Sequence, residues 1–156
     1  MTRTQVLDRS VAEALSALSG AAERGLGDPV LAELVMIRAS QLNHCAFRLD
    51  MHLAPARKNG VSENRLQLLN AREEAEDHYS ERERAALAFT EAVTALTASA
   101  SRTASGRDFV PDAVYERAAK HFDETELAHL VGLITAINSW NRLMVSVRVA
   151  PGGYRP

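Results

Sequence analysis

Three side chains that could carry out chemistry lie within one short stretch of the sequence, at Cys45, Arg48 and His52. A cysteine thiolate is a nucleophile, a guanidinium binds carboxylates and other anions, and an imidazole exchanges protons near neutral pH. In a helix, each residue turns the chain by about 100°, so these three residues share one face. The spacing therefore predicts a site on a helix face.

Cys45 is the only cysteine of the chain, and it stands at the head of this predicted helix. Free backbone N–H groups and the positive end of the helix dipole favour a thiolate there, and Arg48 follows one turn later. A second interpretation remains open, in which Cys45 is a small buried apolar residue. We expect no direct bond between Cys45 and His52, because seven residues of helix span about 10 Å.

His52 can be a proton shuttle or a hydrogen-bonded histidine of the core or an interface, and the sequence leaves both interpretations open. Metal binding by His44, Cys45, Asp50 and His52 is not expected. Ligands on one helix face are usually three or four residues apart, and these four are not spaced in that way. We therefore predict no metal and no cofactor, and we place His44 in a loop or helix cap.

The elements that position these residues are predicted to be helices, because alanine, leucine and glutamate are plentiful and no strand-like alternation is sustained. Asp28 and Pro29 mark the start of a helix that should end near Leu42. Ser80 begins a capping box ahead of a second long helix, and Asp123 begins a similar pattern ahead of a third. The fold class is therefore predicted to be all-α.

Weaker signals predict helices at about 5 to 19, 63 to 76 and 111 to 120. Asn59 and Gly60 are typical of the end of the helix that Cys45 begins. The stretch from about Thr97 to Pro111 is rich in small polar residues, so we predict a mobile loop there.

Composition limits the class of protein. The chain has 156 residues, a formal net charge of −2, 46% hydrophobic residues and 24% charged residues. These values predict a single soluble domain over residues 1–156 and give no reason to expect a nucleic-acid partner. No apolar run approaches membrane-spanning length, and the start lacks the apolar core of a signal peptide, so we predict a cytoplasmic protein without an internal disulfide.

Four segments carry a resemblance to a known family, and they are Glu33 to Gln41, Asn43 to His52, Tyr79 to Ala88 and Ile137 to Leu143. They resemble the alkylhydroperoxidase D-like (AhpD-like) branch of the carboxymuconolactone decarboxylase family over roughly residues 28–147. The resemblance implies an all-helical domain of about six to seven helices that assembles into homo-oligomers, commonly trimers or hexamers.

Redox members of this family carry Cys-x-x-Cys followed four residues later by histidine, and the second cysteine attacks the hydroperoxide. Arg48 stands at that second position here. The resemblance also assigns the proton-relay glutamate to Glu33, twelve residues before Cys45, although a glutamate at the edge of an apolar stripe is usually solvated. The implied site is therefore Glu33, Cys45, Arg48 and His52.

Two further residues, Arg38 and Trp140, are expected to have structural roles. Arg38 projects into the apolar arc of its helix, so we expect a structural ion pair, with Glu33 as one candidate partner. Trp140 lies in the segment that resembles the closing helix of the family, and we interpret it as core packing with polar neighbours at a subunit contact.

Three functions follow from these observations. The first is alkylhydroperoxidase-like, one-cysteine hydroperoxide reduction, in which Cys45 is oxidised and then reduced by an external thiol, Glu33 and His52 manage protons and Arg48 stabilises the anion. The second is decarboxylase or lyase chemistry, in which Arg48 binds a substrate carboxylate and His52 or Glu33 transfers the proton. The third is a non-catalytic oligomeric protein that retains the fold.

Overall fold

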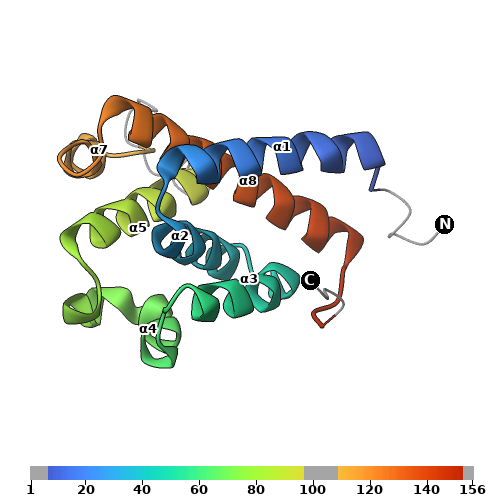
Figure 1. Ribbon diagram of the computed structural model, residues 1–156, viewed down its shortest axis with the longest axis horizontal. Helices are drawn as coiled ribbons and strands as arrows, with labels where there is room; N and C mark the ends of the chain where they lie inside the picture. Colours follow the sequence, from blue (N-terminus) through green and yellow to red (C-terminus); the bar gives the residue numbers. More distant parts are fainter. Residues whose placement is uncertain (1–6, 97–108, 153–156) are drawn as a thin grey trace.

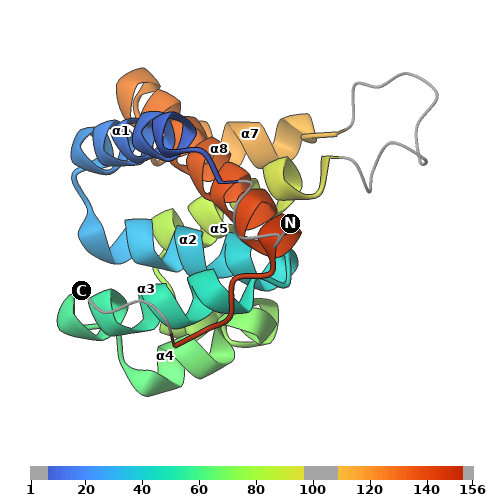
Figure 2. The same cartoon turned by 90° about the vertical axis from the view of Figure 1, so that its right-hand side faces the viewer.

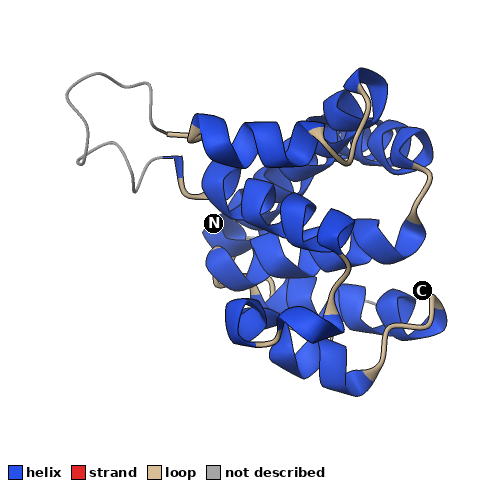
Figure 3. Cartoon of the chain, turned by 90° about the vertical axis from the view of Figure 1, so that its left-hand side faces the viewer, coloured by secondary structure: helices blue, strands red, loops and turns tan. Residues whose placement is uncertain are grey.

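The computed structural model describes residues 7–96 and 109–152, and within them it contains helices, turns and no strand (Figures 1 and 3). The prediction of an all-α fold is confirmed. The elements are α1 (Arg9–Leu26), α2 (Pro29–Leu42), α3 (Ala46–Lys58), α4 (Glu63–Leu68), the 3-10 segments η2 (Leu69–Glu74) and η3 (Glu76–His78), α5 (Glu81–Thr94), α7 (Asp112–Ala119) and α8 (Glu124–Val147).

The strongest start signals of the sequence act as predicted. The Asp28 carboxylate accepts a hydrogen bond from the backbone N–H of Leu31, and Pro29 is the first residue of α2. Ser80 and Asp123 each form a reciprocal capping box with the glutamate three residues later. These caps satisfy backbone N–H groups that a helix start would otherwise leave unpaired.

The weaker predictions need correction at two places. The first helix runs over Arg9–Leu26 instead of 5 to 19, and it ends because Gly27 adopts a left-handed conformation with φ 66°. The predicted helix at 63 to 76 is divided into α4 and η2, and η2 is itself kinked at Ala71, which has non-helical φ −118° and ψ 30°. The predicted loop at 97 to 111 lies almost entirely outside the described residues.

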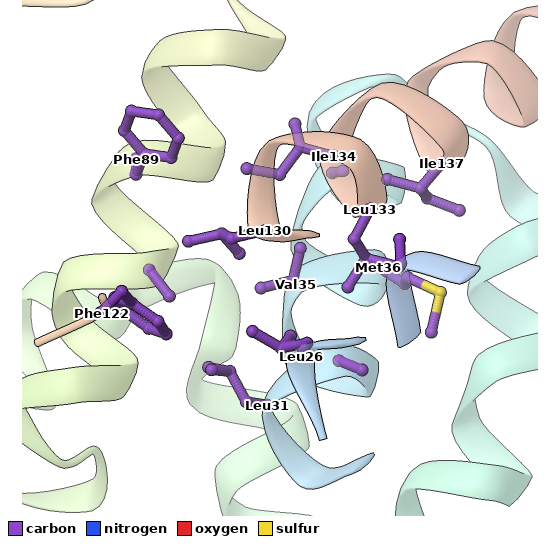
Figure 4. Close-up of a cluster of buried hydrophobic side chains, with 14 of the residues drawn as sticks. Leu26, Leu31, Val35, Met36, Phe89, Phe122, Leu130, Leu133, Ile134 and Ile137 are labelled. Atoms are coloured by element: carbon purple, nitrogen blue, oxygen red, sulfur yellow. The ribbon is translucent and has the colours of Figure 1, made fainter. Parts of the chain in front are cut away.

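The helices surround α2, which contacts α1, α3, α5 and α8. α1 and α8 pack together above it, and α3 and α4 lie below it (Figures 1 and 2). The larger apolar cluster joins α2 to α1, α5 and α8, with Leu31, Leu130 and Ile134 among its fully buried members (Figure 4). A second cluster joins α2 to α3, α4 and α5. Burial on two sides holds α2 rigidly between them.

The length and apolar composition of α8 alone would allow it to cross a membrane, and it is the single helix in the described residues that meets this test. Half of that apolar stretch is buried inside the fold. Such burial is typical of the core helix of a soluble protein.

Candidate functional site

A network of side-chain amides fixes the turn that leads from α2 into α3. The Asn43 amide donates to the side-chain oxygens of Asn138 and Asn141 on α8, each at 2.9 Å. Asn141 donates in turn to the Ser40 hydroxyl at 2.9 Å, and the backbone N–H of Cys45 donates to the Ser40 carbonyl at 3.0 Å. The start of α3 is therefore anchored to both α2 and α8, which orients the face of α3 that carries the predicted site.

Cys45 is the residue immediately before α3, and it is only 2% exposed. Its thiol forms no capping hydrogen bond with the helix. This environment fits the interpretation of Cys45 as a small buried apolar residue, because reactive thiols are usually partly exposed. Reactivity of Cys45 stays a prediction.

Glu33 on α2 and His52 on α3 meet inside the fold. The distance between Glu33 Oε2 and His52 Nδ1 is 3.0 Å, and the two residues are 8% and 5% exposed. Because a carboxylate only accepts hydrogen bonds, Nδ1 donates to it, and in the neutral form of the imidazole the lone pair is then on Nε2. His52 Nε2 is buried and has no hydrogen-bond partner among the described residues. Glu33 thus orients the imidazole through Nδ1 and leaves Nε2 without a protein hydrogen bond in the described part of the chain.

Arg48, one turn before His52 on α3, is 7% exposed and is stacked against Trp140 of α8. Its guanidinium carbon lies 4.3 Å from the centre of the Trp140 ring, within the range of a cation–π interaction. The indole N–H of Trp140 donates to the Ser19 hydroxyl of α1 at 3.1 Å, which fixes the ring. Trp140 is therefore half-buried against the site, and the sequence interpretation of it as core packing missed this contact.

A cavity of about 530 Å³ lies between α1, α2, α3 and α8, and both Arg48 and His52 line it. This volume falls in the range of small-molecule sites, which are mostly apolar with a few placed polar groups. Cys45 is not among the described residues that line it. The larger apolar side chains of the wall include Met36, Phe47, Met51, Leu133, Ile137, Trp140 and Met144.

Glu23 of α1 also lines this cavity, and the sequence interpretation did not identify it. Partial burial at the wall raises the pKa of Glu23, and the negative charge of Glu33 raises it further, while His52 and Arg24 offset part of the effect. The predicted helix at 5 to 19 stopped short of Glu23. Gly27, directly before the next helix start, was the signal that could have extended the first helix to its observed end.

The family model described as the carboxymuconolactone decarboxylase family matches residues 9–92. The chain belongs to this family. The uncharacterized protein YdfG of Bacillus subtilis (strain 168) is a relative with 42% identity over 115 residues, which are 74% of this chain and 71% of YdfG.

A solved structure of another relative extends the likeness to almost the whole fold. It is a protein of unknown function from Agrobacterium tumefaciens whose proposed role is that of the antioxidant defence protein AhpD. It shares 31% sequence identity with this chain and has a TM-score of 0.80, with 94% of each chain covered. The chain is therefore an AhpD-like member of the carboxymuconolactone decarboxylase family.

The predicted partner of Arg38 has to be corrected. Its guanidinium pairs with Glu91 of α5, with Nε 2.7 Å from Glu91 Oε1, and not with Glu33. Arg72 also binds Glu91, which joins three charged side chains. The expectation of a structural ion pair was right, and the suggested partner was wrong.

The remaining predictions concern metal binding, His44 and assembly. Among the described residues, no group of three or more His, Cys, Asp or Glu side chains could hold a metal ion. His44 lies outside the helices with φ 52°, in the turn before α3. Assembly into trimers or hexamers and a cytoplasmic location stay predictions, and light scattering would test the first.

Proposed function

We propose that His52 is the acid–base group of this protein and acts on a small carboxylic acid that Arg48 holds in the cavity. The observation that supports this most is the asymmetry of the imidazole. Nδ1 is bonded to Glu33 at 3.0 Å, whereas Nε2 is buried without a partner among the described residues. A carboxylate on one ring nitrogen fixes the tautomer and stabilises the imidazolium that forms when the other nitrogen takes a proton.

Arg48 suits the role of a carboxylate anchor. The Trp140 ring covers one face of its guanidinium, and the N–H groups of a guanidinium point outward from its edges, where a carboxylate binds in a two-point fashion. The mostly apolar wall strengthens such an interaction, because apolar surroundings lower the local dielectric constant around the charge. A ligand with an apolar body and one carboxylate matches this cavity.

The proposed reaction is proton transfer at carbon. A C–H bond made acidic by neighbouring unsaturation gives its proton to His52 Nε2, and the electron pair stays on the substrate as a delocalised anion. The imidazolium then returns a proton to the same carbon or to another one, which gives exchange or isomerisation. The step needs no oxidant and no cofactor, because electrons and atoms balance within the substrate and His52.

Deuterium uptake tests this proposal. Wild-type protein in D₂O should catalyse the exchange of carbon-bound hydrogen for deuterium in β,γ-unsaturated carboxylic acids with apolar bodies. Proton NMR monitors this exchange. His52→Gln should lower the rate by about 10²-fold or more, the usual contribution of a positioned acid–base group. Arg48→Met should weaken binding of the carboxylate, measured by calorimetry.

A matched control exists for the arginine. Arg82 of α5 is also stacked on an aromatic ring, with its guanidinium carbon 3.9 Å from the centre of Phe122, but it is absent from the lining of the cavity. Arg82→Met should leave carboxylate binding unchanged. Equal losses of affinity in the two arginine variants would contradict a specific role for Arg48.

Thiol-dependent reduction of hydroperoxides is the second candidate, and the proposed AhpD role of the Agrobacterium tumefaciens relative favours it. Here the Cys45 thiolate would attack a peroxide oxygen, release the alcohol and become a sulfenic acid, which two external thiols would reduce with loss of water. Consumption of an organic hydroperoxide with a dithiol, by wild type and by Cys45→Ser, tests this route. Cysteine-dependent turnover would favour it over the acid–base function, and Arg48→Cys should then raise the activity strongly.

A further inference from the structure

Glu23 differs from the Glu33–His52 pair in its access to solvent. Its side chain is exposed on α1, yet it lines the same cavity as His52. Glu33 and His52 are both less than a tenth exposed. Glu23 is therefore a carboxyl group that faces bulk water on one side and the cavity on the other.

The charges around Glu23 connect it to the buried pair. Burial at the wall is the largest cause of its raised pKa, and repulsion from Glu33 is the next, while the nearby His52 and Arg24 act in the opposite direction. Arg48 is the further charged group of the cavity wall, and α8 contributes no titratable side chain to that wall in the described part of the chain. The charges of Glu33 and His52 therefore both act on the pKa of Glu23.

A buried base needs a route by which its proton reaches solvent. Nδ1 of His52 is occupied by Glu33, so the proton must leave or enter through Nε2. A carboxyl group whose pKa is raised toward the working pH exchanges protons more effectively than an ordinary one, because its acid and base forms are then closer in population. Glu23 has both the place and the acidity for that task.

We propose that Glu23 carries protons between bulk water and His52 Nε2 by way of the cavity. In one direction, the imidazolium releases its Nε2 proton to the Glu23 carboxylate, and the resulting carboxylic acid gives this proton to water. The reverse sequence protonates the base. No bond other than O–H and N–H changes and no redox partner is needed. This inference rests on the acid–base function proposed for His52.

The experiment measures proton exchange without a substrate. Relaxation dispersion of the His52 Cε1 carbon, recorded at the pH where half of this imidazole is protonated, reports how fast Nε2 gains and loses its proton. Glu23→Gln should slow this exchange by about tenfold or more, because it removes a positioned proton carrier. Added formate, a small carboxylic acid that can enter the cavity, should restore the rate. An unchanged rate in folded Glu23→Gln protein would overturn the proposal.

Two controls separate a proton carrier from a structural residue. Glu13 lies on the same helix and forms an exposed pair with Arg9, so Glu13→Gln should leave the exchange rate at the wild-type value. The carboxyl carbon signal of Glu23 should titrate at lower pH in Glu33→Gln, because the repelling charge is gone. A slow Glu23→Gln variant that formate does not restore would count against proton transfer by this carboxyl.

The outcome also separates this inference from the proposed function. If Glu23→Gln slows exchange but His52→Gln leaves deuterium uptake unchanged, the proton path exists and the proposed carbon-acid reaction fails. If His52→Gln abolishes uptake while exchange in Glu23→Gln is normal, the reaction stands and Glu23 is not its proton carrier.

Discussion

Helix α2 contributes one charged residue to each of two buried clusters, and the clusters differ in how fully their polar atoms are used. In the Glu91 cluster, made of Arg38, Arg72 and Glu91, both carboxylate oxygens accept from guanidinium groups at 2.5 to 2.7 Å. Arg38 also donates to Gln41 and Asn70. We call this cluster saturated, because none of its buried polar side-chain atoms lacks a hydrogen-bond partner in the described part of the chain.

The Glu33 cluster, made of Glu33 and His52, is left incomplete. One hydrogen bond joins its two members, and His52 Nε2 has no partner among the described residues. A buried polar atom without a partner costs free energy, so His52 Nε2 requires an explanation, and the proposed acid–base function supplies one. The comparison teaches that α2 places one charged residue where all the hydrogen bonds are used, at Glu91, and one beside a ring nitrogen that is left for the chemistry proposed above, at His52.

The largest expected effect is the breaking of the saturated cluster. Glu91→Gln removes the one negative charge that the guanidinium groups of Arg38 and Arg72 share. The free energy of unfolding should fall by about 2 to 3 kcal/mol, below the roughly 3 to 5 kcal/mol for a fully buried pair, because Glu91 is partly solvated. Chemical denaturation measured by circular dichroism checks this value. A variant as stable as wild type would show that the cluster does not support the fold.

The next effect is a loss of stability of the fold at low pH. Burial alone would raise the pKa of Glu91, but hydrogen bonds from Arg72 and Arg38 outweigh it and hold the pKa below the ordinary value of 4.5. The cluster therefore stabilises the fold fully above pH 4.5, and this contribution is lost as the pH falls through the lowered pKa. Wild type should lose stability over this acid range more steeply than Glu91→Gln. Parallel pH profiles of the two proteins would contradict this role of Glu91.

The same two clusters show how far the sequence could be interpreted. An arginine in an apolar arc indicated a buried ion pair, but the chain has 20 acidic residues and only tertiary packing selects Glu91. Helix starts such as Ser80 and Asp123 were predictable, because a cap is a contact between residues three apart. Local sequence signals predict helix starts, but they do not predict which residues meet when the contact is long-range.

The site was predictable in part for the same reason. Arg48 and His52 share a helix face by spacing alone, whereas Glu33 entered only through the family resemblance and lies 19 residues from His52 in sequence. Glu23 and Trp140 come from α1 and α8. These two helices pack against each other although they lie near opposite ends of the sequence. No local pattern indicates that the first and last helices of the described chain enclose a cavity with α3.

A smaller effect is expected when the incomplete cluster is altered. Glu33→Gln keeps a side-chain oxygen that can accept from His52 Nδ1, so the free energy of unfolding should fall by at most about 1 kcal/mol, the scale of one hydrogen bond. Deuterium uptake should fall far more, because the amide no longer stabilises an imidazolium. A loss of stability as large as that of Glu91→Gln would remove the distinction between the two clusters.

The smallest effect, and one of opposite sign, is expected at Glu23. Because its pKa is raised in the fold, the neutral form is favoured there, and its contribution to stability is lost as the pH rises through the raised pKa. At neutral pH the charged carboxylate therefore opposes folding slightly, and Glu23→Gln should increase the melting temperature a little. The increase should vanish below the ordinary pKa of glutamate, 4.5, where both proteins are uncharged at this position. A variant that is less stable at neutral pH would mean that Glu23 makes a favourable contact, and its place at the cavity would then be structural.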